Sequence, residues 1–111
     1  MKPERLDRKI TLERFTFTTD AGSGEQVKTW AQIVPPVWAS RRRASARETL
    51  AAAEVSAEVT DIFETRWDSS WSDLDAKDRL VYEGRTYEIA TVDEIGRREG
   101  LRIAASARAD E

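Results

Sequence analysis

The chain of 111 residues contains neither cysteine nor histidine. Without cysteine it forms no disulfide and offers no thiolate to a metal. Histidine is the commonest general base and the commonest metal ligand in proteins. Its absence excludes Ser-His and Cys-His catalytic pairs and structural zinc sites. The sequence therefore predicts a protein that is not an enzyme, with no catalytic residues, no cofactor and no metal.

Long apolar segments are also missing. No run approaches the roughly 20 residues that span a bilayer, and residues 1–5 lack the apolar core of a signal peptide. Hydrophobic residues make up 40% of the chain and charged residues 35%, which suits a soluble domain with a modest core. We expect a single domain over residues 1–111, made in the cytoplasm and not bound to a membrane.

Charge is unevenly distributed along the chain. The net charge of -3 argues against general wrapping by nucleic acid. Residues 41–47 nevertheless carry four bases and no acid, whereas residues 54–83 carry nine acids and three bases, a local net charge of -6. Such blocks pair either within a subunit or across a subunit boundary, and both stay open. The candidate contact residues are Arg41, Arg42, Arg43 and Arg47 on one side and Asp68, Asp73 and Asp75 on the other.

Alternation of apolar and polar residues predicts strands in the first part of the chain. Residues 6–18 read as one long strand with a bulge or bend near Arg14, where the apolar parity changes. A loop follows at residues 20–24. A second extended stretch covers residues 26–40 and is interrupted at Pro35-Pro36, which donates no ladder hydrogen bonds. Residues 57–67 read as a further strand.

The last third of the chain gives the clearest pattern. Residues 79–82 and 85–92 flank Glu83-Gly84, which predicts a tight β-hairpin. A second turn at residues 95–100 precedes a closing strand at 101–106, and residues 107–111 are expected to fray. The sequence thus predicts a mainly β fold: a small antiparallel β-barrel or sandwich of five to six strands, built from residues 6–39 and 57–106.

One short helix is expected within an insert at about residues 40–56. Residues 44–55 are rich in alanine and other helix formers, and Ser45 with Glu48 has the spacing of a capping box. Leu50 is its only large apolar side chain. Such a helix buries little area and is marginal alone, so we expect it to dock weakly unless another chain covers it. Leu50 therefore joins the arginines as a candidate interface or channel residue.

The four tryptophans receive different predictions. Trp30 and Trp38 lie on either side of the Pro35-Pro36 break and are predicted to fill the core. Trp67 and Trp71 lie among acidic residues, which disfavours a platform for nucleic acid.

A series of short motifs follows the chain in order. The opening strand is Leu6-Asp7-Arg8-Lys9-Ile10, a glycine-containing tip leads to Trp30, and Val37-Trp38-Ala39 follows. Arg66-Trp67 comes after the insert, and residues 82–89 satisfy the pattern Tyr-x-Gly-x-x-Tyr-x-Ile. In this order, over residues 5–106, the chain resembles the phage head-tail adaptor or head-closure (head completion, stopper) family. The Ala-rich, Arg-rich insert departs from the family pattern.

The resemblance implies a structural virion protein of a tailed phage, prophage or gene transfer agent. Such a protein joins the head portal complex to the tail at the virion neck, after assembly in the host cytoplasm. It implies a ring of six or twelve copies around the DNA channel, with a portal or adaptor ring on the head side and a tail terminator or tail on the other. Packaged DNA passes through without sequence-specific binding. In head-closure members an inserted loop helps to retain the DNA, and residues 40–56 stand in that place.

Two other interpretations stay open. A small β-barrel module could bind nucleic acid or peptide as a monomer, and salt-dependent DNA binding would support it. An enzyme could use carboxylates alone, and its first sign would be a buried pair of acids with perturbed pKa values.

Overall fold

The computed structural model describes residues 6–107. In this part of the chain seven strands and one helix follow one another. They are β1 (Arg8–Thr19), β2 (Gln26–Gln32), β3 (Val37–Arg43), α1 (Ala46–Glu54), β4 (Asp61–Arg66), β5 (Arg79–Tyr82), β6 (Arg85–Ile95) and β7 (Gly100–Ala107). The fold is mainly β with one short helix, as the sequence predicts. There are seven strands rather than five or six, and the prolines at 35 and 36 divide the second stretch into β2 and β3.

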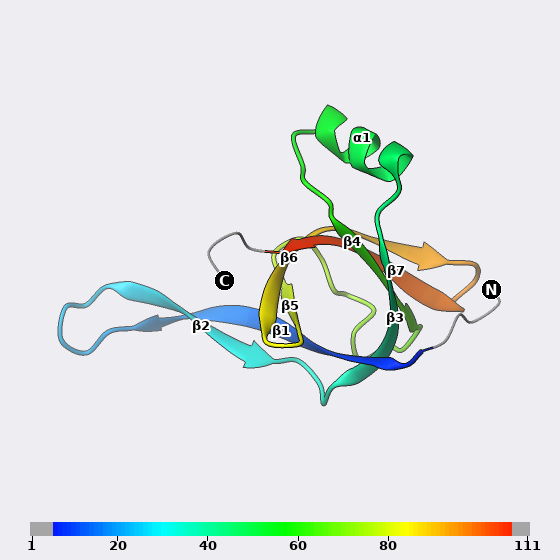
Figure 1. Ribbon diagram of the computed structural model, residues 1–111. Helices are drawn as coiled ribbons and strands as arrows, with labels where there is room; N and C mark the ends of the chain where they lie inside the picture. The colour runs from blue at the N-terminus through cyan, green and yellow to red at the C-terminus, as the bar shows by residue number, and fades with distance from the viewer. Residues whose placement is uncertain (1–5, 108–111) are drawn as a thin grey trace.

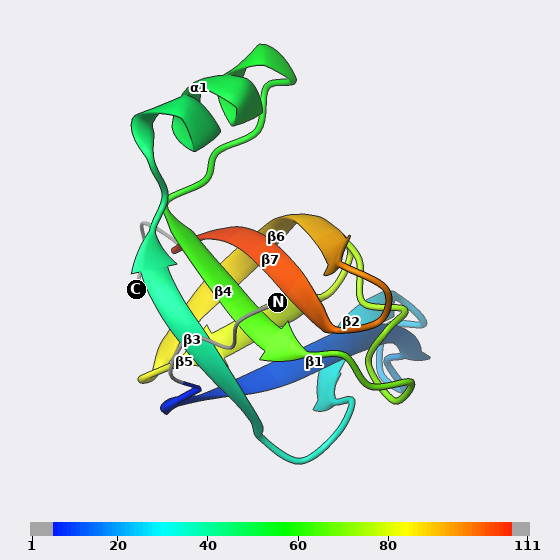
Figure 2. The same cartoon turned by 90° about the vertical axis from the view of Figure 1, so that its right-hand side faces the viewer.

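All strands belong to one antiparallel sheet in the order β2-β1-β3-β4-β7-β6-β5, and β5 pairs back onto β1. The sheet therefore closes on itself, and Figure 2 shows its strands surrounding the core with α1 standing above them. Strand β1 serves three partners in succession. Residues 8–10 pair with β3, residues 11–13 with β5, and residues 13–19 with β2.

Local turn chemistry explains the hairpin between β5 and β6. Glu83 and Gly84 have φ angles of 51° and 77°, and positive φ at both central residues is what a type I′ turn requires. The turn matches the right-handed twist of the flanking strands, so β5 and β6 pair directly from Tyr82 opposite Arg85.

The core is centred on Phe63 of β4. Its ring meets Tyr82 and Tyr87 edge-to-face, with ring centroids 5.7 and 5.3 Å apart, a favourable arrangement for aromatic rings. The other buried residues of this cluster come from β1, β3, the β4–β5 connector (residues 67–78), β5, β6 and β7: Ile10, Leu12, Val37, Ala39, Leu74, Leu80, Ile89, Ile103 and Ala105. Most strands thus contribute inward-facing side chains to one core.

The second half of β1 and all of β2 project beyond the closed sheet as a two-stranded arm (Figure 1). We call residues 14–19 and 26–32 the β1–β2 arm. Strand β1 runs through Arg14 as one continuous strand. The parity change predicted there marks the place where the strand leaves the core: Leu12 is fully buried, whereas Phe17 on the arm is exposed.

The prediction that Trp38 fills the core is wrong, because 52% of its surface is exposed. Trp38 is the outward-facing neighbour of two buried residues, Val37 and Ala39. Trp30 is only half-buried on the arm, and Trp71 of the connector packs against the core instead. Alternation along β3 decides this arrangement, since successive side chains point to opposite faces of a strand.

The described chain contains no helix that is long and apolar enough to cross a membrane. The predicted frayed tail begins at Ala107, which belongs to β7, and its remaining residues, 108–111, lie outside the described residues.

Candidate functional site

The predicted insert is a helix held away from the closed sheet on two strand ends. Residues 41–43 of β3 pair with residues 61–63 of β4, and α1 stands beyond them (Figures 1 and 2). The capping box is present: the Ser45 Oγ accepts a hydrogen bond from the Glu48 amide, and the Glu48 carboxylate accepts one from the Ser45 amide. None of the residues of α1, all of which are described, is buried, and Leu50 is 65% exposed. The insert is therefore a weakly docked, protruding element.

The arginines of the insert divide into two pairs. Arg41 contacts the buried carboxylate of Asp61, with 2.6 Å between Nη2 and Oδ2. Arg42 donates two hydrogen bonds to Glu48, of 2.8 and 2.9 Å. These bonds, and to a smaller extent the hydrogen bond from the Ser45 amide, lower the pKa of the Glu48 carboxyl to about 2.

Arg43 and Arg47 form the second pair. Both are exposed, and neither makes an ion pair with any residue between 6 and 107. Two of the four arginines thus form ion pairs with other described residues, and the other two do not.

The predicted acidic surface lies on the β4–β5 connector, away from the insert. Asp68 and Asp75 are turn-forming residues whose carboxylates accept hydrogen bonds from backbone amides two residues further on. Asp73 accepts a hydrogen bond from Arg14 of β1, which lowers the pKa of the Asp73 carboxyl. The structure therefore does not bring the arginines of the insert to these acids within one subunit.

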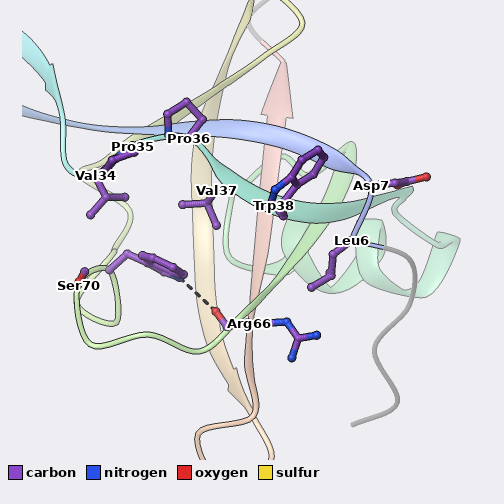
Figure 3. A pocket seen from close by; sticks show the side chains of 10 residues that line it. Leu6, Asp7, Val34, Pro35, Pro36, Val37, Trp38, Arg66 and Ser70 are labelled. Atoms are coloured by element: carbon purple, nitrogen blue, oxygen red, sulfur yellow. Dashed lines mark hydrogen bonds between the residues drawn. The ribbon is translucent and has the colours of Figure 1, made fainter.

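A groove that the sequence did not predict opens beside the connector. Its volume is about 970 Å³, and Pro35, Pro36, Trp38, Trp71 and Arg66 are among the residues that line it. Figure 3 shows the prolines and Trp38 on one side and the Arg66 side chain on the other. The Trp71 indole is fixed because its N–H lies 3.3 Å from both the Thr65 hydroxyl and the Arg66 carbonyl. The signal in the sequence was the Pro-Pro pair followed closely by a tryptophan.

The β1–β2 arm carries a second feature that sequence reasoning missed. Phe15, Phe17 and Trp30 form an aromatic row, with neighbouring ring centroids 5.4 and 5.2 Å apart. Lys28 lies over the Phe15 ring at 4.5 Å, and Arg79 lies over the Trp30 ring at 4.1 Å. The row ends at Phe17, which is 58% exposed. The parity change at Arg14 was the only trace of this surface in the sequence.

Between residues 6 and 107, no three or more acids gather closely enough to hold a metal ion. What this part of the chain presents instead is a rigid closed sheet with a protruding helix, a protruding aromatic arm and an apolar groove. Exposed features of this kind are typical of proteins that assemble with or bind other macromolecules.

The comparisons with known proteins specify this class. The chain matches the phage head completion proteins over residues 1–108. It belongs to that family and is a structural protein of the phage head, a component of the virion. The resemblance inferred from the motif order is thereby confirmed.

Two solved structures are similar. The solution structure of protein SF1141 from Shigella flexneri 2a is 25% identical, with a TM-score of 0.78 and full coverage of both chains. A chain from the virion of a native gene transfer agent particle is 20% identical, with a TM-score of 0.56, covering 92% of this chain and 94% of that one. The second likeness concerns the fold alone. The comparison with curated proteins gave no match.

Proposed function

We propose that this protein joins the portal complex to the tail as one subunit of a ring around the DNA channel. The ring of six or twelve copies lies at the virion neck, between a portal or adaptor ring and the tail terminator or tail. It is assembled in the host cytoplasm, and the protein has no catalytic activity. Membership of the head completion family supports a place in the virion; the ring, its neighbours and the retention of DNA are the proposal.

One observation carries the role of the insert: a capped helix stands off the closed sheet with none of its described residues buried. A helix of nine residues is marginal on its own, so its exposed face calls for a covering surface. Arg43 and Arg47 suit phosphate or carboxylate groups on that surface. Arg41 instead holds the paired ends of β3 and β4 through Asp61, and Arg42 holds the start of α1 through Glu48. The exposed Leu50 supplies the apolar part of the contact.

The connector offers the complementary surface for a neighbour or the tail. The carboxylates of Asp68 and Asp75 accept hydrogen bonds from backbone amides, so they keep their charge available. A closed rotational assembly brings one patch of a subunit against a different patch of the next. Separate basic and acidic elements on one rigid frame satisfy that requirement.

The decisive experiment reverses the two available charges of the insert. Particles would be produced with Arg43→Glu and Arg47→Glu, and with the matched control Arg85→Glu and Arg97→Glu, which changes the same amount of charge at exposed positions off the insert and off the connector. We expect the insert variant to lower the fraction of tailed particles and the nuclease-protected DNA per particle, and the control to behave as wild type. Tailed, DNA-filled particles from the insert variant would refute the role of the insert, and a reconstruction of the neck tests the ring itself.

The same two arginines give a second candidate function, that of a module binding nucleic acid without a ring. Two phosphate contacts predict a slope of about -2 for the logarithm of the binding constant against the logarithm of salt concentration. Purified protein that binds duplex DNA with such a slope, and loses it in the Arg43→Glu, Arg47→Glu variant, would support this function.

A further inference from the structure

We propose that the β1–β2 arm of one copy docks in the apolar groove of a second copy, with Phe17 inserted between the Pro35-Pro36 bend and Trp71. This contact rests on the proposed ring and specifies how neighbouring subunits hold one another. It is a heterologous contact, since the arm and the groove are different surfaces of the same chain.

The arm is built as an element that needs a partner. Beyond the closed sheet it is a ribbon of two strands, and neither of its outer edges pairs with another strand of the described chain. Two-stranded ribbons are marginally stable alone, and open edges are normally covered. Phe17 lies at the distal end of the aromatic row. Its ring contacts Phe15, which in turn contacts Trp30. A large apolar side chain is thus presented on a supported but uncovered arm.

The groove has the character of a receptor for such a side chain. Its volume of about 970 Å³ accommodates an aromatic ring together with the backbone that carries it. Apolar pockets with a few placed polar groups are the usual form of a binding site. The prolines provide a stiff wall, Trp71 is fixed by its indole hydrogen bonds, and Trp38 leaves an exposed aromatic surface beside the opening (Figure 3).

The geometry requires the arm to come from another copy. Lys9 of β1 lies 5.0 Å from the centroid of the Trp38 ring, so the start of β1 runs beside the groove. Phe17 follows eight residues later on the same continuous strand. At about 3.3 Å per residue the strand carries Phe17 about 26 Å from Lys9. It also carries Phe17 about 16 Å beyond Leu12, whose carbonyl accepts a hydrogen bond from the Ile33 amide beside the groove residue Val34. A second copy can bring the end of its arm to the groove on the side of the first copy. Repeating that placement around an axis generates a ring.

Charge supports the same pairing. The loop at the end of the arm, residues 20–25, contains Asp20 and Glu25 and no base. Hydrogen bonds from the Gly22 amide and the Ser23 hydroxyl lower the pKa of Asp20, so this carboxylate stays ionised. Arg66 lines the groove and makes no ion pair within residues 6–107. The other charged lining residue, Asp7, already contacts Arg8 at 3.6 Å, which leaves the groove with Arg66 as its available charge.

Cross-linking tests the contact cleanly because the chain has no cysteine of its own. Ser23→Cys places a thiol at the tip of the arm, and Ser70→Cys places one at the groove. Purified particles carrying both substitutions would be treated with a short bifunctional maleimide and analysed on a denaturing gel. We expect a ladder of multimers of this chain. The matched control replaces Ser70→Cys by Arg85→Cys, an exposed position in the β5–β6 hairpin, and should give no ladder.

A second pair of variants ties the ladder to Phe17. Val27 pairs opposite Thr18, so it is an exposed apolar residue on the other face of the same arm. Added to the double-cysteine chain, Phe17→Ser should reduce the multimers at least tenfold, whereas Val27→Ser should leave them unchanged.

The outcomes separate the contact from the function. If immunoblotting shows that the chain is absent from purified particles, the proposed function fails, and the cross-linking of concentrated purified protein then decides the contact. If the chain is present and gives no more ladder than the Arg85→Cys control, the contact is refuted and the function stands. A ladder that survives Phe17→Ser, or a cross-link from Ser70→Cys to a different particle protein, overturns a second copy as the occupant of the groove.

Discussion

Replacing Arg14 by alanine should destabilise the protein, because it leaves a buried carboxylate without its main partner. Arg14 clamps the β4–β5 connector onto β1 by two hydrogen bonds to the Asp78 carboxylate, each 3.0 Å long, and by one of 3.2 Å to Asp73. These bonds raise the pKa of the guanidinium, so it stays charged. The Asp78 side chain is only 3% exposed, and without Arg14 its carboxylate keeps the hydrogen bond from the Asp75 amide.

The magnitude follows from this burial. Breaking a buried ion pair by removing one partner costs about 3–5 kcal/mol. The Arg14 side chain is 40% exposed, so water can reach the abandoned carboxylate, and we expect a loss of about 2–3 kcal/mol. For a domain of this size that lowers the melting temperature by roughly 10 °C. Because the connector carries Trp71, the same change should loosen the wall of the groove.

Urea unfolding followed by tryptophan fluorescence measures this loss as a shift of the midpoint at constant slope. Arg42→Ala is the matched control: Arg42 also makes two hydrogen bonds to one carboxylate, but both partners face water, and its loss should cost less than about 1 kcal/mol. Adding Asp78→Asn to Arg14→Ala should recover part of the stability, because no buried charge then lacks a partner. Equal losses for Arg14→Ala and Arg42→Ala would refute the reasoning.

Three further predictions concern the core, a turn and the helix. Phe63→Ala removes a fully buried ring and should cost about 3–5 kcal/mol in urea unfolding; a loss below 1 kcal/mol would contradict the assigned core. Gly84→Ala should cost about 1 kcal/mol by the same assay, because φ is +77° and the added Cβ meets nothing within 4 Å, which leaves the backbone conformation as the only cause. Arg42 lowers the pKa of Glu48 from its ordinary 4.5 to about 2. A carboxylate whose pKa is lowered in the folded protein stabilises the fold above its pKa in the unfolded chain. That stabilisation is lost as the pH falls through its pKa in the folded protein. The protection of the α1 amides, measured relative to their intrinsic exchange rates, should therefore fall as the pH drops from about 4.5 to 2, while in an Arg42→Ala variant the same fall should occur at higher pH.

Much of the fold could be predicted because the relevant signals are local. The capping box of Ser45 and Glu48 is a contact between residues three apart, and it forms as its spacing indicates. The turn at Glu83-Gly84 depends on the backbone freedom of two residues. The division between β2 and β3 follows from the missing amide hydrogens of Pro35-Pro36.

The candidate site could be predicted only in part. The short helix was predicted where it forms, because residues 44–55 are rich in helix formers and carry a capping box. Its exposure also follows from the sequence, since a short alanine-rich helix with one leucine buries little area. The sequence could not predict which arginines form ion pairs. Arg41, for example, contacts Asp61, a residue that the pairing of β3 with β4 brings beside it. The groove could not be predicted for the same reason: its walls come from segments about 35 residues apart, near Pro35 and near Trp71.

The sequence by itself determined that disulfides and histidine-based catalytic pairs are excluded. It also determined the strand and turn pattern, the capped helix and the family. Each of these rests on composition, on local spacing or on motif order along the chain. Only the tertiary structure decided that β1 leaves the core after Leu12 to become the arm. It also decided that Trp38 faces outward while Trp71 packs inward. It decided as well that Arg43 and Arg47 make no ion pair within residues 6–107. These outcomes depend on where the sheet closes and on which distant strands pair, and that is a property of the whole fold rather than of any segment.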